Sequence, residues 1–189
     1  MNRDAIITSV QEQMPERRWI HTLGVMKTAV ELADRFGADP AKADLAAILH
    51  DVAKYWPVDR MLRVIREEGL FLEVLEHDKE LWHAHAGAYA AQRDYGVTDP
   101  EVLDAIRYHT SGRAAMTLLE RIVWLADLIE PGRDFPGVDR IRELAGQSLE
   151  KALIAGFDTT IVFLLEKRKR IYPLTVLARN DLILEEAER

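Results

Sequence analysis

The sequence contains no cysteine among its 189 residues. This absence excludes a disulfide framework, a thiolate metal site and a cysteine nucleophile. It fits a reducing compartment, and we expect the protein to be cytoplasmic. Apolar residues make up 48% and charged residues 30% of the chain, which is typical of a folded globular domain and not of a disordered one.

Long apolar runs are also missing. The longest stretch without an Asp, Glu, Lys or Arg residue is Leu81–Gln92, and it contains two histidines. A membrane-spanning helix needs about 20 apolar residues. No signal-peptide-like apolar segment follows the first residues. We therefore expect no membrane partner.

The chain has no excess of positive charge. It carries 25 Lys and Arg against 32 Asp and Glu, a net charge of −7. An acidic chain is a poor general binder of nucleic acid, so we expect no nucleic-acid partner. An anionic ligand would need local positive charge, with or without a metal ion. A small molecule is the partner that we expect.

Strand-like alternation is scarce, and helical periodicity runs almost end to end. Pro15 can open a helix that ends at Phe36 before Gly37, and Asp39-Pro40 reads as the start of the next. We predict one all-α domain over residues 1–189. The expected helices are Pro15–Phe36, Ala41–Tyr55, Val58–Glu68, Ala86–Tyr95, Pro100–His109, Thr117–Glu130, Asp139–Ala145, Leu149–Ile171 and Thr175–Glu188.

Polar residues interrupt two of these apolar helices. His50 and Asp51 lie side by side in an Ala-rich apolar segment, and Asp127 interrupts the apolar run Ile122–Ile129. A buried, unpaired carboxylate is costly, so a cation is expected near each one. For Asp51, the alternatives are Lys54 as that cation, or a surface position at a helix end.

A third such residue is His21, which lies on the apolar stripe of the first long helix. A lone histidine there is more often a core residue that donates to a carbonyl. Together with His50, Asp51 and Asp127, however, it suggests a hard-cation site made from helix side chains. Histidine and carboxylate ligands without thiolate favour iron, manganese or another first-row metal.

Two further histidines complete the set. His83 begins an Ala-rich run, and His109 ends a helix before Thr110–Arg113. That turn offers hydroxyls, backbone N–H groups and a guanidinium, which suit phosphate oxygens, although a helix C-terminus stopped by Gly112 is the simpler interpretation. We treat His77 and His85 as bystanders and favour His83 over His85 as the inward-facing imidazole.

The order His, His-Asp, His, His, Asp resembles the all-helical HD-domain superfamily of metal-dependent phosphohydrolases. Longer blocks resemble its YqeK-type branch, and the resemblance covers most of the chain. These blocks are Arg18–Val25, Leu49–Trp56, Ala105–Arg113, Ala126–Val138, Thr160–Ile161, Ile171–Thr175 and Ala178–Asn180.

The resemblance implies an HD-domain helical bundle with symmetrical dinucleoside tetraphosphatase activity, which would split diadenosine tetraphosphate into two ADP. Carried over by position, the metal ligands would be His21, His50, Asp51 and Asp127, and iron would be the foremost metal. His83 and His109 would hold a second metal or contact the phosphates. The residues around the substrate would be Arg18, Lys54, His83, His109, Thr110 and Arg133.

In this interpretation Asp51 ligates the metal and aligns the attacking water, while His83 or His109 acts as the proton donor. The basic run Lys167–Arg170 is a looser candidate for phosphate binding, equally explained as a solvated helix end. Two alternatives stay open: the same chemistry on a deoxynucleotide or guanosine polyphosphate, or a nucleotide-binding regulatory module. A purely structural bundle would leave the buried carboxylates unexplained. The sequence leaves a homodimer open.

Overall fold

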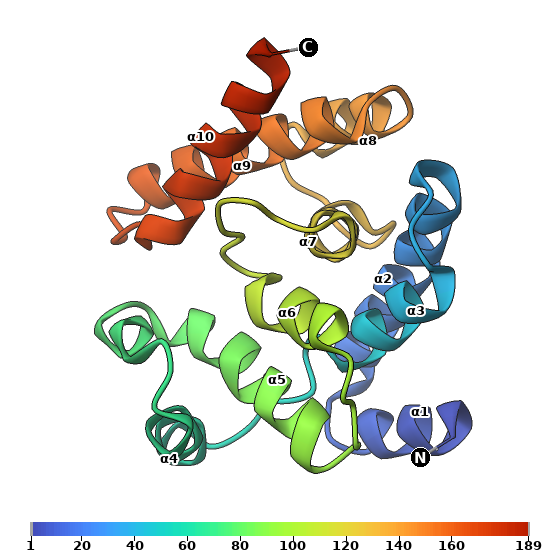
Figure 1. Ribbon diagram of the computed structural model, residues 1–189, viewed down its shortest axis with the longest axis vertical. Helices are drawn as coiled ribbons and strands as arrows, with labels where there is room; N and C mark the ends of the chain where they lie inside the picture. The colour runs from blue at the N-terminus through green and yellow to red at the C-terminus, as the bar shows by residue number, and fades with distance from the viewer. Residues whose placement is uncertain (1, 189) are drawn as a thin grey trace.

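A computed structural model describes residues 2–188 of the chain, which fold into helices without any strand (Figure 1). The predicted all-α class is confirmed. The α-helices are α1 (Arg3–Gln11), α2 (Glu16–Phe36), α3 (Pro40–Leu49), α4 (Val58–Glu68), α5 (Trp82–Arg93), α6 (Pro100–Tyr108), α7 (Leu118–Ile129), α8 (Val138–Ala145), α9 (Leu149–Glu166) and α10 (Pro173–Ala187), and two short 3-10 helices are η1 (Leu72–Glu76) and η2 (Lys79–Leu81).

Several helix starts follow from local chemistry. The Asp39 side chain accepts hydrogen bonds from the backbone N–H groups of Ala41 and Lys42, and Pro40 occupies the first turn of α3. Asp99 and Pro100 repeat this arrangement at α6. An aspartate N-cap followed by proline satisfies otherwise free N–H groups without losing a needed donor. These starts were therefore predictable to within a residue.

Helix α3 ends at Leu49 and is therefore shorter than the predicted helix Ala41–Tyr55. Tight turns follow, in which the N–H of Val52 donates to Leu49 and the N–H of Lys54 donates to Asp51. His50 and Asp51 thus lie in the first of these turns and not within a regular helix. The two adjacent side chains meet there, with His50 Nε2 3.2 Å from Asp51 Oδ2.

The predicted bounds of two other helices were also wrong. Helix α5 begins at Trp82 and not at Ala86, so both His83 and His85 lie in its first turn. Helix α9 ends at Glu166 and not at Ile171, because the chain turns at Arg168, whose φ is 51°. The helix α1 was not predicted, although Ile6 and Val10 have the spacing of a buried helix face.

Helix α7 lies at the centre of the molecule, between α2 and α6 on one side and α9 on the other (Figure 1). Its Ile122 and Leu125 side chains are completely buried. The rings of Trp124 and Phe157 stack with their centroids 3.9 Å apart and join α7 to α9. None of the helices described in residues 2–188 is long and apolar enough to cross a membrane.

A buried histidine and carboxylate cluster as candidate metal and active site

Polar residues from five segments meet where α2, α3, α5, α6 and α7 converge. They are buried or nearly so, in a protein whose core is otherwise apolar. The cluster consists of His21 on α2, His50 and Asp51 after α3, His83 on α5, His109 after α6 and Asp127 on α7.

Asp51 is the centre of this cluster. Its side chain is 3% exposed. Its Oδ1 atom lies 2.9 Å from His83 Nε2 and 3.8 Å from His109 Nε2. Its Oδ2 atom lies 3.2 Å from His50 Nε2 and 2.9 Å from the Arg18 guanidinium, which donates to it. One carboxylate thus links two groups of histidines.

The outer nitrogens of two histidines are fixed by backbone carbonyls. His50 Nδ1 lies 2.6 Å from the carbonyl oxygen of Ala47, and His109 Nδ1 lies 2.7 Å from that of Ile106. A carbonyl oxygen can only accept, so each Nδ1 carries the proton. When each ring is neutral, its Nε2 presents a lone pair to the cluster, which is how a metal-binding histidine is oriented.

The donor set fits a divalent metal. His21 Nε2 and His50 Nε2 are buried and have no hydrogen-bond partner. His21, His50 and Asp51 bring ligand atoms within 4.8 Å of one another, and so do Asp51, His83 and His109. Buried nitrogen atoms without a hydrogen-bond partner, next to carboxylates, lower the stability of the folded protein unless a cation binds to them. Neutral imidazole and carboxylate ligands without sulfur are the set that first-row metals accept.

The electrostatics of the cluster agree with this assignment. Burial opposes ionisation of Asp51, but the charge on His50 holds the pKa of Asp51 well below its ordinary value. Burial likewise opposes charge on His50, yet the Asp51 carboxylate raises the pKa of His50. Burial and the charges of His50 and His83 lower the pKa of His109 to about 3. The Asp51 carboxylate therefore stays ionised, and its negative charge favours a cation in the cluster.

The structure distinguishes His83 from His85. Two residues along a helix differ by about 200° in direction, so the two side chains point to opposite faces of α5. His83 enters the cluster, whereas His85 packs against Phe71, with ring centroids 5.5 Å apart. His77 lies beside Tyr172, away from the cluster. His83 is thus the imidazole of α5 that faces the cluster, while the roles of His77, His83 and His85 stay predictions.

Lys54 lies on the outer side of His83. Its ammonium is 3.5 Å from His83 Nδ1 and 2.9 Å from Glu80 Oε2, to which it donates. An ammonium group can only donate, so Nδ1 of His83 faces it as an acceptor. Burial lowers the pKa of His83. The neutral ring therefore carries its proton on Nε2, opposite to the arrangement in His50 and His109.

Asp127 lies at the other end of the cluster. Its Oδ1 atom is 3.0 Å from His21 Nε2, and it accepts a hydrogen bond of 2.5 Å from Arg133. Burial would raise the pKa of Asp127, but the charge of Arg133 holds it well below its ordinary value. The Nε atom of Arg133 also donates to the Asp127 carbonyl. Arg133 is thus positioned at the edge of the cluster by Asp127 itself.

A pocket of about 380 Å³ opens directly onto the cluster. This volume falls in the range of about 300–1,000 Å³ that small-molecule sites occupy. The predicted substrate residues Arg18, Lys54, His83, His109, Thr110 and Arg133 all line it. The lining residues to which the sequence assigned no role in the site are Asp78, Glu80, Leu81, Trp124, Leu128, Thr160, Phe163, Leu164, Tyr172 and Thr175, of which Thr160, Tyr172 and Thr175 lie in the blocks that carry the resemblance.

The basic run after α9 forms one edge of this pocket through Lys169 and Arg170. Lys169 donates to Asp78, and Arg170 donates to the carbonyl of Glu76, so both side chains are tied to the segment of η1 and η2. Arg113, whose guanidinium is one possible phosphate contact in the sequence, has a different partner. Its guanidinium donates twice to buried Glu120 on α7 and does not line the pocket.

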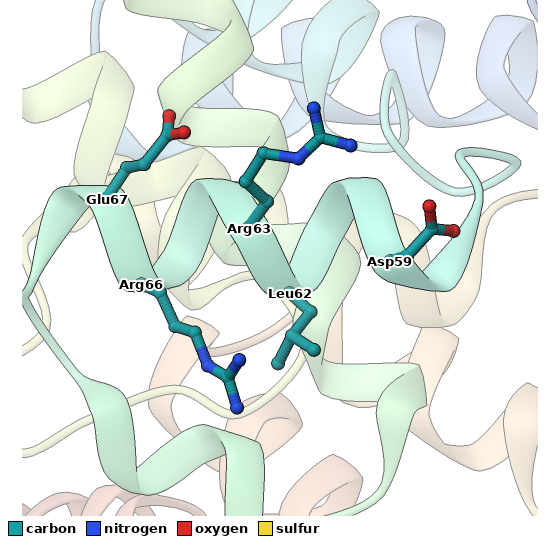
Figure 2. Close-up of a pocket in the computed structure, with 5 residues that line it drawn as sticks. All are labelled: Asp59, Leu62, Arg63, Arg66 and Glu67. Carbon is teal, nitrogen blue, oxygen red and sulfur yellow. The ribbon is translucent and has the colours of Figure 1, made fainter.

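A second hollow runs along α4, and Figure 2 shows the five residues that line it, Asp59, Leu62, Arg63, Arg66 and Glu67. All of them come from one helix, and four are exposed. Their charged ends spread apart instead of converging on a point (Figure 2). This hollow lacks the polar groups from several elements that make a binding site specific.

Comparison with known proteins agrees with the cluster. The HD domain family matches residues 18–132. The symmetrical bis(5'-nucleosyl)-tetraphosphatase of Bacillus subtilis is 52% identical over 183 residues, which cover 97% of this chain and 98% of that protein. The protein of the same name from Halalkalibacterium halodurans is 46% identical over 186 residues, which cover 98% of this chain and 100% of the relative.

A solved structure has the same fold over its whole length. It is a predicted HD superfamily hydrolase involved in NAD metabolism from Clostridium acetobutylicum, with a TM-score of 0.93 and 41% sequence identity, and the match covers 98% of each chain. With its paired histidine and aspartate at the centre of the cluster and relatives matched almost end to end, the chain belongs to the HD-domain hydrolase family, together with the symmetrical bis(5'-nucleosyl)-tetraphosphatases.

Proposed function

We propose that this protein hydrolyses diadenosine tetraphosphate symmetrically, giving two ADP. The observation that carries the proposal is the pocket that opens onto the Asp51 cluster, in a chain matched along 97–98% of its length by relatives with that name. A water oxygen attacks one central phosphorus, the bridging P–O bond to the other central phosphate breaks, and each half leaves as ADP.

The metal ligands in this proposal are His21, His50, Asp51 and Asp127. A divalent cation bound there would lower the pKa of a coordinated water and screen phosphate charge. Iron is the metal that we favour, with manganese as the nearest alternative. His83 and His109 lie on the pocket side of Asp51 and either hold a second cation or contact the phosphates.

The protein's own residues perform two further tasks. Asp51 accepts a hydrogen bond from the attacking water and holds it in line. His83 lines the pocket, and its Nε2–H lies beside Asp51 and His109 in the free protein. With substrate bound, this N–H donates to a phosphate oxygen or to the leaving ADP, which takes a proton as the bond breaks. Arg18, Lys54 and Arg133 supply fixed positive charge, and Thr110 offers a hydroxyl donor to the phosphates.

We also propose that residues 1–189 form one domain. A single core cluster contains residues from Ile6 in α1 to Leu182 in α10, so the helices beyond the matched HD segment share its interior. The cytoplasmic location and a homodimer stay predictions from the sequence.

Product analysis tests the function. Purified protein with added Mn²⁺ or Fe²⁺ is incubated with diadenosine tetraphosphate in oxygen-18 water, and the products are separated by anion exchange. We expect ADP alone, with one label in one of the two ADP molecules. AMP with ATP would overturn the symmetrical assignment. Turnover only of deoxynucleotides or guanosine polyphosphates would favour the first alternative, and binding without turnover would favour the regulatory module.

A further inference from the structure

Glu130 is a buried carboxylate that the proposed reaction does not use. It directly follows α7, three residues after Asp127, and is 3% exposed. Its Oε1 atom lies 3.0 Å from His21 Nδ1, on the side of the ring opposite the cluster. Its Oε2 atom accepts a hydrogen bond from the backbone N–H of Gly132 at 2.5 Å.

Two glycines make the space for this carboxylate. A Cβ atom on Gly24 would lie 2.4 Å from Glu130 Oε2, and one on Gly132 would lie 3.0 Å from both carboxylate oxygens. Neither glycine has a positive φ, so the backbone conformation does not require glycine at either position. Glycine fits at both positions because the Glu130 carboxylate lies too close to leave room for a Cβ atom. Residues from α2 and from the turn after α7 thus enclose one side chain.

We infer that Glu130 is a positioning residue that fixes His21 as a metal ligand. By accepting from Nδ1–H, it leaves the lone pair on Nε2, the nitrogen that faces Asp127 and lacks a hydrogen-bond partner. Backbone carbonyls perform this task for His50 and His109. His21 receives a carboxylate as its acceptor instead.

The chemistry of the two acceptors makes glutamine a sharp test. Glutamate offers two acceptor oxygens, one for His21 Nδ1–H and one for the Gly132 N–H. Glutamine has nearly the same shape but offers one acceptor and one donor group. If its oxygen stays with Gly132, its amide N–H₂ meets His21 Nδ1 and favours the tautomer with the proton on Nε2. That proton would stand where the metal binds.

The experiment measures Mn²⁺ binding to metal-free protein by titration calorimetry. Glu130→Gln is expected to weaken Mn²⁺ binding by about 10–100-fold. Nitrogen-15 spectra of the metal-free proteins should show His21 shifting from the Nδ1–H to the Nε2–H tautomer. Glu120→Gln is the matched control, because Glu120 is equally buried on α7 but pairs with Arg113. It should leave both Mn²⁺ affinity and the His21 tautomer unchanged.

A second variant keeps the carboxylate and moves it. Gly24→Ala places a methyl group against Glu130 and should also weaken Mn²⁺ binding, even if Glu130→Gln does not fold. Wild-type Mn²⁺ affinity and an unchanged His21 tautomer in either folded variant would overturn the inference. The inference rests on the proposed metal site. Because metal affinity is measured without a nucleotide, failure to hydrolyse diadenosine tetraphosphate would not decide it.

Discussion

The Nε2 atoms of His83 and His109 lie 3.1 Å apart, and both rings are buried. Two N–H groups would repel at this distance, so the pair shares one proton or a cation. The Ile106 carbonyl places the proton of His109 on its outer nitrogen, whereas Lys54 leaves that of His83 on the inner one. His83 is therefore the donor and His109 the acceptor of the pair.

The proposed role of His83 as a proton donor can be tested by comparing its replacement with that of His85, the other histidine on α5. His83→Ala should reduce the hydrolysis rate by about 10²–10⁴-fold, the usual contribution of a general acid or base. His85→Ala should keep the rate within a few-fold, because His85 faces away from the cluster. Steady-state kinetics of both variants checks the prediction, and an equal loss in the two would contradict it.

Asp51 is expected to be indispensable for turnover but not for folding. Asp51→Ala removes the group that links the histidines and positions the water, so activity should fall by at least about 10³-fold. The helical core does not depend on it, and circular dichroism should stay close to that of the wild type. Asp104→Ala, at a half-exposed carboxylate paired with Arg113, is the control. Near-normal turnover by folded Asp51→Ala would remove Asp51 from the reaction.

Removal of metal should lower thermal stability. The cluster contains buried histidine nitrogens and a carboxylate that can bind a cation. A ligand at 100 times its Kd stabilises the folded state by about 2.7 kcal/mol. Scanning calorimetry should therefore give a lower Tm after chelation and recovery when Mn²⁺ is added. The Asp51→Ala variant should lose most of this response, and an identical response would place the stabilising metal elsewhere.

Stability should also depend on pH through His85. Burial lowers the pKa of His85 to about 3, so the ring stays neutral in the folded protein. In the unfolded chain it gains a proton below about pH 6.5. The contribution of neutral His85 to the free energy of unfolding is therefore fully present above pH 6.5. As the pH drops from 6.5 toward 3, this contribution falls by about 1.4 kcal/mol per pH unit.

Urea unfolding between pH 6.5 and 4 measures this slope. The His85→Leu variant should show a shallower fall in the free energy of unfolding than the wild type. Since the cluster histidines titrate in both proteins, the difference between the two slopes isolates His85. Parallel curves would mean that His85 is protonated without cost.

Gly112 should be intolerant of any side chain. Its φ is +64°, and an added Cβ would lie 2.6 Å from the Phe157 ring and 2.9 Å from Ala178. Strain and overpacking together should make Gly112→Ala less stable by about 2–4 kcal/mol. Gly37→Ala is the control, because Gly37 has a φ of +83° with no atom within 4 Å. It should lose only about 1 kcal/mol. Chemical denaturation of both variants checks the difference.

The sequence predicted the cluster better than the surfaces around it. Polar residues on otherwise apolar helix faces, such as His21 and Asp127, stand out because burying a polar group without a partner is costly. Glu130 carried no such indication, since it follows an apolar helix as a capping residue would. The turns after Leu49 were missed because the apolar pattern continues through Val52 and Ala53, which are buried without being helical.

The pocket wall opposite the cluster could not be predicted, because distant segments form it. Phe163 and Tyr172 reach the pocket only when α9 ends at Glu166 and the following loop turns toward η1 and η2. Contacts such as Lys169 with Asp78 join residues 91 positions apart. Local periodicity contains no information about such pairings.

The two sides of the pocket come from different parts of the chain. The proposed metal ligands all fall inside the segment that matches the HD domain, residues 18–132, whereas the facing wall comes from residues 160–175. Changes at residues 160–175 would therefore alter the shape of the pocket while leaving the proposed metal ligands in place. Helices α9 and α10 thus shape the pocket from outside the segment that matches the HD domain family.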